Sequence, residues 1–522
     1  MTRREGVAWL VATVVLAGLP AGGASARVGQ QEHLVQTVVP LPSTVTRVEF
    51  PSYTDDGRRV LAGAQSSAFA GTQIVSFRED GSGFTCLSCG AWSGPALTKP
   101  AAFPDGRRVL VRVGDQTPFS PADHGVLECL PSLLDCRGAR VLPIEVPSAG
   151  DPNVVQDQRE FRVSPDGVHV AFTQIRRSAS GRETGAGIVG RLVRDGARYR
   201  VTGPRVVATD GELKGFTPDG GAVTFARFLG AFEAGNPDDV AVDLATGRES
   251  RLTWAPDWDE DVDLSPARYR GRDWLVAGSA RGAGLLEAVA QVRRPTAIEL
   301  GLSALPFVVF RERGPQIAEP WLVAVGADRT GDLGRPLAPG ANASGWDSRA
   351  VTRWKPDGTA VVFWQRRIDG EGTRVIVVRL ADRRPACPPR PARSPVPRWA
   401  PPLAGYVPDD PPLPRSRRGR VSGRMVVTTG PSPVQGFGSG IEVRYLGFSD
   451  ERGLVLDGVE RAGYTVTGFL YGNPSVYDAD VVVSGRHRGW LRASGVPIGP
   501  GGVGGTIESQ LDGRRVSLGP LP

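Results

Sequence analysis

Five carboxylates lie in one short stretch, at Asp257, Asp259, Glu260, Asp261 and Asp263. Carboxylates at alternate positions suit calcium, a hard cation that prefers oxygen ligands. The stretch is not an EF-hand loop, because it has no glycine at its sixth position and no glutamate at its twelfth. Asp257, Asp259, Asp261 and Asp263 are therefore a weak calcium candidate, and a solvated loop is the alternative. We expect no other cofactor.

The sequence contains few groups suited to nucleophilic or acid–base catalysis. A serine hydrolase of the α/β class needs a Gly-x-Ser-x-Gly elbow, and the sequence has none. None of its four histidines, His33, His124, His169 and His487, is close in sequence to an obvious serine or cysteine partner. We therefore expect a protein that is not an enzyme, and we name no catalytic residue. The alternative is a metal-assisted hydrolase or lyase whose side chains converge only in the fold.

Four of the five cysteines form two close pairs, Cys86 with Cys89 and Cys129 with Cys136. In an oxidising compartment such spacing favours short-range disulfides. A Cys-x-x-Cys also occurs in redox centres and zinc sites, but zinc would need a second matching pair. No partner is assigned to Cys387.

The acidic residues, histidines and cysteines must be positioned by the secondary structure, and the clearest sign of that structure is a repeated turn. Pro-Asp-Gly occurs four times, and a fifth copy has Asp55 in place of the proline. Proline presets φ, aspartate caps its own turn and glycine accepts a positive φ, so each copy predicts a hairpin. The structural turn residues are Asp56, Gly57, Asp105, Gly106, Asp166, Gly167, Asp219, Gly220, Asp357 and Gly358.

Apolar residues recur at fixed distances from these turns. A valine stands four residues after every turn aspartate, as expected if each outgoing strand has one buried face. Successive aspartates lie 49, 61, 53 and 138 residues apart, and the longest gap holds a degenerate copy between Val262 and Gly278. Six units of about fifty residues predict an all-β, six-bladed β-propeller. Seven blades are the alternative, because the stretch 280–345 is hard to divide.

The run Ser164-Pro165-Asp166-Gly167, followed by Val170-Ala171-Phe172, resembles the TolB-like (WD40-like) six-bladed β-propellers. Asp80-Gly81-Ser82-Gly83 is similar to a hairpin of that family, and Leu252-Thr253 to the end of one of its blades. The resemblance covers about residues 35–385 and implies the fold, which by itself implies no activity. It also suggests that His33 to Val39 form the strand that closes the ring on the last blade.

Aligned on the turns, the acidic stretch precedes the inner strand of blade five, at one mouth of the central channel. Other blades place charged residues at equivalent positions, and a ring of mixed charge is typical of a binding face. The candidate binding residues are Lys99, Arg159, Glu160, Glu212, Lys214, Asp259, Glu260, Asp347 and Arg349. Solvated loops are the alternative interpretation.

The composition divides the chain into four parts. Residues 1–26 have the pattern of a secretory signal peptide, with Arg3 and Arg4 before an apolar run and a small-residue cleavage site ending at Ala26. We expect an exported protein, secreted or in the periplasm or cell envelope. Residues 27–385 are predicted to form the propeller, 386–420 a Pro/Arg-rich linker, and 421–522 a small C-terminal β-sandwich or barrel.

The net charge of +7 comes from the linker region, because residues 383–424 hold ten arginines and only two acidic residues, both aspartates. A local excess of this kind argues against a nucleic-acid partner. A solvated linker is the plain interpretation, and contact with an anionic envelope surface is the alternative. We therefore predict a monomeric, non-enzymatic binding or scaffold protein that recognises a protein, peptide or glycan at one channel mouth.

Overall fold

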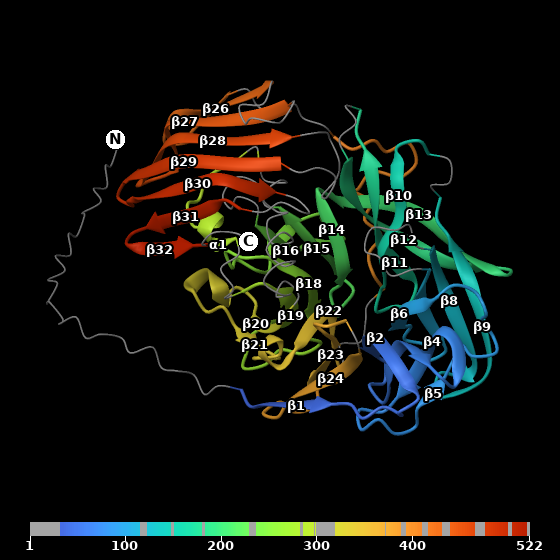
Figure 1. Ribbon diagram of the computed structural model, residues 1–522. Coiled ribbons are helices and arrows are strands. Elements are labelled where there is room, and N and C mark those ends of the chain that lie inside the picture. Colours follow the sequence, from blue (N-terminus) through green and yellow to red (C-terminus); the bar gives the residue numbers. More distant parts are fainter. Residues whose placement is uncertain are drawn as a thin grey trace, which may run out of the picture.

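The computed structural model describes residues 32–114, 123–147, 151–179, 183–228, 236–281, 286–296, 298, 319–370, 372–387, 393–409, 416–430, 439–464, 475–498 and 504–518. Strands dominate these residues, which confirms the all-β prediction (Figure 1). The predicted signal peptide, residues 1–26, lies outside the described residues.

The propeller consists of four-stranded antiparallel units, the blades, whose first strands contact one another around the channel (Figure 1). Two neighbouring blades are also joined through their outer strands into one eight-stranded sheet. Blade 1 contains β2 (Val45–Tyr53), β3 (Val60–Ser66), β4 (Phe69–Phe77) and β5 (Thr85–Cys86). Blade 2 contains β6 (Leu97–Ala102), β7 (Arg108–Val113), β8 (Asp123–Ser132) and β9 (Asp135–Glu145). Blade 3 contains β10 (Val154–Val163), β11 (His169–Arg177), β12 (Glu183–Asp195) and β13 (Arg198–Thr209).

The remaining described strands of the propeller form three more units. Blade 4 contains β14 (Gly211–Phe216), β15 (Ala222–Phe228), β16 (Pro237–Asp243) and β17 (Glu249–Arg251). Blade 5 contains β18 (Asp259–Leu264), β19 (Trp274–Ser279), β20 (Glu319–Ala324) and β21 (Arg335–Pro336), with the short helices α1 (Glu287–Ala290) and η1 (Ala327–Thr330). Blade 6 contains β22 (Trp346–Trp354), β23 (Ala360–Arg367), β24 (Thr373–Leu380) and β1 (Leu34–Val38), preceded by the 3-10 turn η2 (Asn342–Ser344).

The repeated turns join the first and second strands of a blade. In the first copy, the Asp56 carboxylate accepts hydrogen bonds from the Thr54 hydroxyl at 2.7 Å and from the Arg58 amide at 3.0 Å. Gly57 has φ 65°, a left-handed conformation that favours glycine. The other four copies also place their glycine at a positive φ. The aspartates therefore stabilise their own turns, and Asp166 also accepts from the Ser394 amide at 2.9 Å.

The chain ends of the propeller meet in blade 6. β1 pairs antiparallel with β24, with Leu34 opposite Leu380, so the strand expected to close the ring does so. Just outside this pair, the buried Arg383 guanidinium donates to both carboxylate oxygens of Glu32, at 2.6 and 3.2 Å. The same guanidinium lies 4.7–5.1 Å from the ring centroids of Tyr269, Trp274 and Trp354. A buried ion pair and three aromatic rings thus reinforce the closing strand.

Disulfides join Cys86 to Cys89 and Cys129 to Cys136, and Cys387 is free and exposed. Both bonds lie near blade edges, the first at β5 and the second across the β8–β9 hairpin. These are the two pairs predicted from spacing.

The C-terminal domain is one eight-stranded antiparallel meander in its described residues (Figure 1). Its strands pair in chain order: β25 (Ser416–Arg418), β26 (Ser422–Gly430), β27 (Ser439–Glu451), β28 (Leu454–Tyr464), β29 (Ser475–Gly485), β30 (Gly489–Ile498), β31 (Thr506–Leu511) and β32 (Arg514–Ser517). Alternate residues such as Val443, Val481 and Leu491 are fully buried on one face. The sequence predicted a small β-sandwich or barrel, whereas the described residues of this domain form a single sheet.

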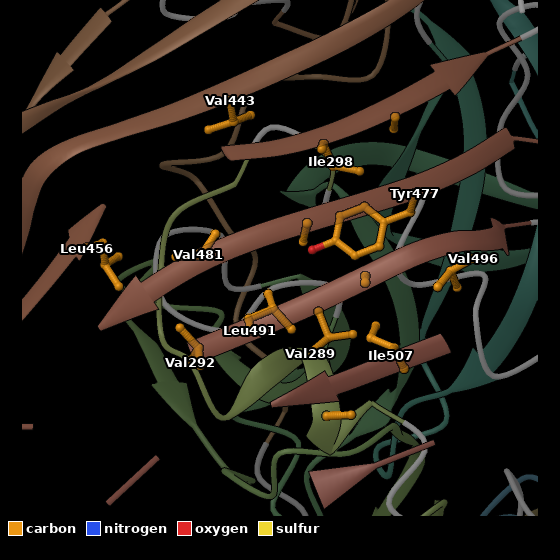
Figure 2. Close-up of a cluster of buried hydrophobic side chains, with 14 of the residues drawn as sticks. Val289, Val292, Ile298, Val443, Leu456, Tyr477, Val481, Leu491, Val496 and Ile507 are labelled. Atoms are coloured by element: carbon orange, nitrogen blue, oxygen red, sulfur yellow. The ribbon is translucent and has the colours of Figure 1, made fainter. Parts of the chain in front are cut away.

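A segment of blade 5 covers that buried face. Between β19 and β20 the chain leaves the propeller, and Val289, Val292 and Ile298 pack among the side chains of the C-terminal sheet (Figure 2). We call residues 286–296 with 298 the blade-five insertion. It explains why this stretch resisted division into blade strands: its apolar residues belong to another core.

One buried ionic cluster anchors the blade-five insertion. The Arg294 guanidinium donates to Glu460 Oε1 at 2.5 Å and to the Tyr477 hydroxyl at 3.1 Å. The Tyr477 hydroxyl donates to the same carboxylate at 2.6 Å, and the Tyr445 hydroxyl donates to its other oxygen. Arg294 and Glu460 are both fully buried. Arg294 also donates to the Val289 and Val292 carbonyls at 2.7 and 2.8 Å, so the hydrogen bonds of this buried ion pair are made within the protein.

The Pro/Arg-rich segment differs from the expected solvated linker. Residues 393–409, which we call the strap, run along blades 3 and 4. The Pro401 carbonyl accepts from the Val206 amide at 3.0 Å, and the Leu403 amide donates to Pro204 at 3.0 Å. The Trp399 indole donates to the Leu244 carbonyl at 3.0 Å, and Leu403 is buried in the blade 2–3 core. The interpretation as a solvated linker is wrong for the strap, because its residues make hydrogen bonds and buried apolar contacts with the propeller.

Glu460→Gln tests the anchor of the blade-five insertion. The change leaves the Arg294 charge buried without a counter-ion, so we expect a loss of about 3–5 kcal/mol in the free energy of unfolding. Glu442→Gln is the matched control, because Glu442 pairs with the more exposed Arg444 and Arg461 on the same sheet, and we expect a loss of about 0–1 kcal/mol. Urea unfolding of the full chain followed by tryptophan fluorescence measures both. Equal losses in the two variants would contradict the anchoring role.

Candidate functional site

Every inner strand of the propeller carries a β-bulge at the same place. The pairing register between first and second strands shifts after Glu49, Thr98, Arg159, Leu213, Glu260 and Arg349, and β2 and β10 have further shifts nearer their starts. At four of these bulges a residue other than glycine has a positive φ: Phe50 at 50°, Lys99 at 47°, Glu160 at 52° and Asp261 at 56°. Bulges re-aim side chains and are frequent beside functional sites. Residues with strained backbone angles cluster at functional sites, so their repetition at these positions indicates a functional region.

Side chains at the bulges link one blade to the next by ion pairs. Lys99 of blade 2 contacts Glu160 of blade 3 at 3.2 Å, and Arg159 of blade 3 pairs with Glu212 of blade 4. Lys214 of blade 4 contacts Glu260 and, at 3.6 Å, Asp261 of blade 5. We call this set, together with Arg162, the channel ring. It brings together six of the nine binding residues predicted from the sequence: Lys99, Arg159, Glu160, Glu212, Lys214 and Glu260.

Two further contacts continue the channel ring through blades 6 and 1. Asp263 of blade 5 lies 3.9 Å from Arg353 of blade 6 and accepts from the Trp354 amide at 2.9 Å. In blade 1 the ring is aromatic: Phe50 has the Lys99 ammonium 5.1 Å from its centroid and the Trp364 ring at 5.1 Å. Phe50 therefore joins blade 6 to blade 2 by cation–π and aromatic contacts.

The pKa values within the channel ring follow from burial and from neighbouring charges. Burial opposes the charge on Lys214, but the carboxylates of Glu212 and Glu260 outweigh it, and the lysine pKa is raised well above its usual value. Burial raises the pKa of Glu260 to about 7 against the opposing effect of Lys214. Burial also opposes ionisation of Glu212, yet Lys214 and Arg159 lower its pKa to about 2. Glu212 and Glu260, which share the Lys214 ammonium, therefore have very different pKa values.

The acidic stretch is dispersed by the fold. The sequence placed it in a loop before the inner strand, whereas Asp259, Glu260, Asp261 and Asp263 are within β18 itself. Asp259 is fully buried, and its two carboxylate oxygens accept hydrogen bonds from Nη2 and Nε of Arg281, at 2.6 and 2.8 Å. Asp257, just before β18, accepts from the Leu286 amide at 3.1 Å.

The four calcium candidates therefore have separate partners. Asp259 pairs with Arg281, Asp261 lies 3.6 Å from Lys214, Asp263 lies 3.9 Å from Arg353, and Asp257 accepts from the Leu286 amide. Within the described ranges, no group of three or more histidine, cysteine or acidic side chains is arranged to hold a metal ion. The arrangement gives the calcium prediction no support.

Asp347 and Arg349, also predicted from the sequence, pair with each other at 2.8 Å on β22. They lie nearer the start of the inner strand than Arg353, and burial raises the pKa of Asp347 to about 6. Sequence reasoning missed Phe50, Arg162 and Arg353 in the channel ring. Arg162 could have been found, because it lies two residues after Glu160 and so on the same face of the strand. The positions of Arg353 and Phe50 in the channel ring depend on β-bulges, which cannot be predicted here from the residue types.

The four histidines occupy four separate places. The buried His124 on β8 donates its Nδ1 hydrogen to Gln158 at 3.2 Å, and His169 on β11 bonds to the turn residue Asp166 at 3.0 Å. His487 contacts Asp512 at 2.7 Å in the C-terminal domain, and the His33 amide donates to Asp382 at the closing strand. Each has a local structural partner.

Sheet order, the closing strand and the repeated turns agree with the fold expected from the sequence. The fold is a TolB-like β-propeller. Solved structures with this fold include TolB from Acinetobacter baumannii, 15% identical over 62% of this chain and 66% of that chain, with a TM-score of 0.33. Others are a putative TolB from Agrobacterium tumefaciens, 16% identical over 59% and 90% with a TM-score of 0.31, and an oligogalacturonate lyase in complex with manganese, 13% identical over 67% and 97% with a TM-score of 0.35.

Values this low carry no argument about the activity of this TolB-like propeller. No family model and no curated protein sequence matches the chain. In the described part of the chain, no helix is long and apolar enough to cross a membrane. What the propeller does must be argued from its own residues.

The pH dependence of stability reports on the interior beside the channel ring. Burial, together with the nearby charges of Arg112 and Lys99, lowers the pKa of His124 to about 3, against about 6.5 in an unfolded chain. Between these values the unfolded chain binds the extra proton, so the free energy of unfolding falls as the pH is lowered from about 6.5 towards 3. From pH 7 to pH 4 this histidine should cost about 3 kcal/mol.

His124→Asn keeps the donor to Gln158 and removes the titration, so it should flatten the pH dependence by that amount. His33→Asn, at an exposed position, should follow the wild-type curve. Urea unfolding at several pH values measures all three proteins. A His124→Asn curve parallel to wild type would show that His124 is not buried as a neutral group.

Proposed function

We propose that this chain is an exported, non-enzymatic β-propeller that binds a protein, peptide or glycan at one mouth of its channel. The observation that supports it most is the channel ring: charged and aromatic side chains from every blade, placed by repeated bulges on the inner strands. Such convergence is typical of a recognition surface. The expected monomer and the absence of a nucleic-acid partner remain predictions from the sequence.

The topology favours the mouth at which the inner strands begin. In an antiparallel blade, the start of the first strand and the connection from second to third strand lie at the same end. The blade-five insertion is such a connection, and it leads into the core of the C-terminal sheet. The repeated Asp-Gly turns lie at the other end.

Trp258 links the C-terminal domain to the channel ring. It lies directly before β18, belongs to the same buried cluster as the C-terminal sheet, and donates its indole hydrogen to Glu260 at 3.0 Å. A ligand at this mouth would therefore meet two surfaces, the ring and the neighbouring domain. This arrangement supports a role for the C-terminal domain as a second contact.

The rival function is a metal-assisted hydrolase or lyase at the same mouth. Catalysis of that kind needs convergent histidines or carboxylates that are free to act. In the described residues the ring carboxylates are held by lysine and arginine, and the four histidines lie on separate elements. We therefore favour binding. Export rests on the sequence of residues 1–26, and the two disulfides agree with an oxidising compartment.

Charge reversal at each end of the channel tests the proposal. Arg349→Glu changes the favoured mouth, and Arg58→Glu is the matched control on the first Asp-Gly turn at the other end. Immobilised mature protein is incubated with an envelope fraction of its own cells, and bound molecules are identified and weighed by mass spectrometry. We expect a ligand retained by wild type and Arg58→Glu, reduced about tenfold by Arg349→Glu, and recovered with unchanged mass.

Equal retention by all three proteins would place the ligand elsewhere. A ligand recovered in cleaved or eliminated form would favour the enzyme. Thermal unfolding of each variant confirms that the comparison is made between folded proteins.

A further inference from the structure

A hollow of about 590 Å³ lies on the sheet of the C-terminal domain. Its lining comes from two neighbouring hairpins, β29–β30 and β31–β32, and includes both of their turns. Ligand pockets commonly have volumes of about 300–1,000 Å³, so this hollow is large enough for a small organic ligand. None of its lining residues belongs to the channel ring, so it is a separate place on the molecule.

An aromatic ring forms one wall of the hollow. Trp490 on β30 lies directly opposite Gln510 on β31, and the residues next to them, Leu491 and Ser509, are fully buried. Because side chains alternate between the two faces of a sheet, Trp490 and Gln510 point away from the buried cluster in Figure 2. Trp490 therefore lies on the outer face of the sheet, where it is only partly buried.

Two arginines contact the Trp490 ring without closing the hollow. The guanidinium carbons of Arg492 and Arg515 lie 5.0 and 5.9 Å from the ring centroid. Neither arginine lines the hollow, although Trp490 does. The cation–π contacts thus hold the ring in place and leave part of its flat apolar surface open to a ligand.

Hydrogen bonds join the two turns beside the hollow. The Asp512 amide donates to the Arg488 carbonyl at 2.8 Å, and the Arg488 amide donates to Asp512 Oδ1 at 3.0 Å. Nδ1 of His487 lies 2.7 Å from Asp512 Oδ2. A site that is already ordered in this way loses less conformational freedom when a ligand binds.

Three polar side chains of the lining can bond to such a ligand. The Arg488 guanidinium supplies donors, the Asp512 carboxylate supplies acceptors, and the Gln510 amide supplies both. In the part of the chain that the structure describes, the side chains of Arg488 and Gln510 make no hydrogen bond or ion pair with the protein. Their donors and acceptors are therefore available to a ligand.

The charge of the lining is balanced. Among the lining residues, Arg488 is the one cation and Asp512 the one anion. A polyanion would place like charge against Asp512, and a polycation against Arg488. A peptide cannot add to the sheet here as an extra strand, because β30 already pairs with β29 and with β31. An uncharged ligand with many hydroxyl groups matches this lining better than either a polyion or a strand.

We propose that the hollow binds a neutral oligosaccharide. A sugar ring carries C–H groups on its faces and hydroxyls around its edge, so one face can pack on Trp490 while the edge bonds to polar side chains. Gln510, Arg488 and Asp512 supply those bonds. This site goes beyond the proposed function, because it lies on the C-terminal domain and uses no residue of the channel ring.

Isothermal titration calorimetry of the full mature chain tests the proposal. The neutral probes are maltotetraose, cellotetraose and N-acetylchitotetraose, which differ in linkage and substituents, and an oligogalacturonate is the charged comparison. We expect at least one neutral probe to bind saturably and more tightly than the oligogalacturonate. Trp490→Ala should weaken that binding about tenfold or more, and Trp490→Phe, which keeps an aromatic ring, should weaken it less.

Trp346→Ala is the matched control. Trp346 is also a partly buried tryptophan that contacts two arginines, Arg367 and Arg374, but it begins β22 at the favoured channel mouth. This variant should bind the neutral probe as wild type does. Thermal unfolding shows whether each variant is folded. Should Trp490→Ala fail to fold, Gln510→Ala serves as the second variant and should weaken binding roughly threefold to tenfold.

The proposal is overturned if none of the three neutral probes binds, if the oligogalacturonate binds more tightly than all of them, or if Trp490→Ala binds as wild type. Loss of binding in Trp346→Ala but not in Trp490→Ala would place the sugar at the channel mouth and would also overturn it. Failure here leaves the proposed function standing, since the Arg349→Glu comparison uses the natural ligand and the other domain.

Discussion

The pairing of β1 with β24 holds the whole propeller together. A ring of blades stays open until its two ends are joined. Five backbone pairs, Leu34 to Val38 opposite Leu380 to Ile376, join the first described strand to the last blade. Arg383 then adds an ion pair to Glu32 and contacts to three aromatic rings from blades 5 and 6. The channel ring can form only because the inner strands are held in this closed circle.

Closure explains why the inner-strand charges pair across blades as well as within them. Each blade presents its bulge to a neighbour on either side, so a cation on one blade meets a carboxylate on the next. Lys99, Arg159 and Lys214 each follow this rule. The pairs stabilise the ring and also fix the direction of side chains that a ligand would meet. Stability and the proposed recognition would therefore depend on the same residues.

Much of this could be predicted from the sequence, and the reason is local chemistry. A Pro-Asp-Gly turn determines its own geometry, so five copies were enough to align the blades and to give Lys99, Glu160 and Lys214 equivalent positions in successive blades. The same alignment failed for Asp259, because its partner Arg281 comes from a connection with no repeat to align. The positive φ angles at Phe50 and Lys99 could not be predicted from the sequence either, since neither residue type favours that conformation. Contacts such as Arg294 with Glu460 join positions 166 residues apart, and no local pattern encodes them.

The blade-five insertion has a consequence for how the protein is made. Synthesis proceeds from the N-terminus, and domains generally fold as units in that order. The apolar residues Val289 and Val292 emerge well before the sheet that covers them, and the sheet itself is complete only with its last strands. A nearly finished propeller therefore exposes the apolar residues of this segment until the C-terminal sheet has been synthesised. The nascent chain is most exposed to aggregation, and most in need of a chaperone, during that interval.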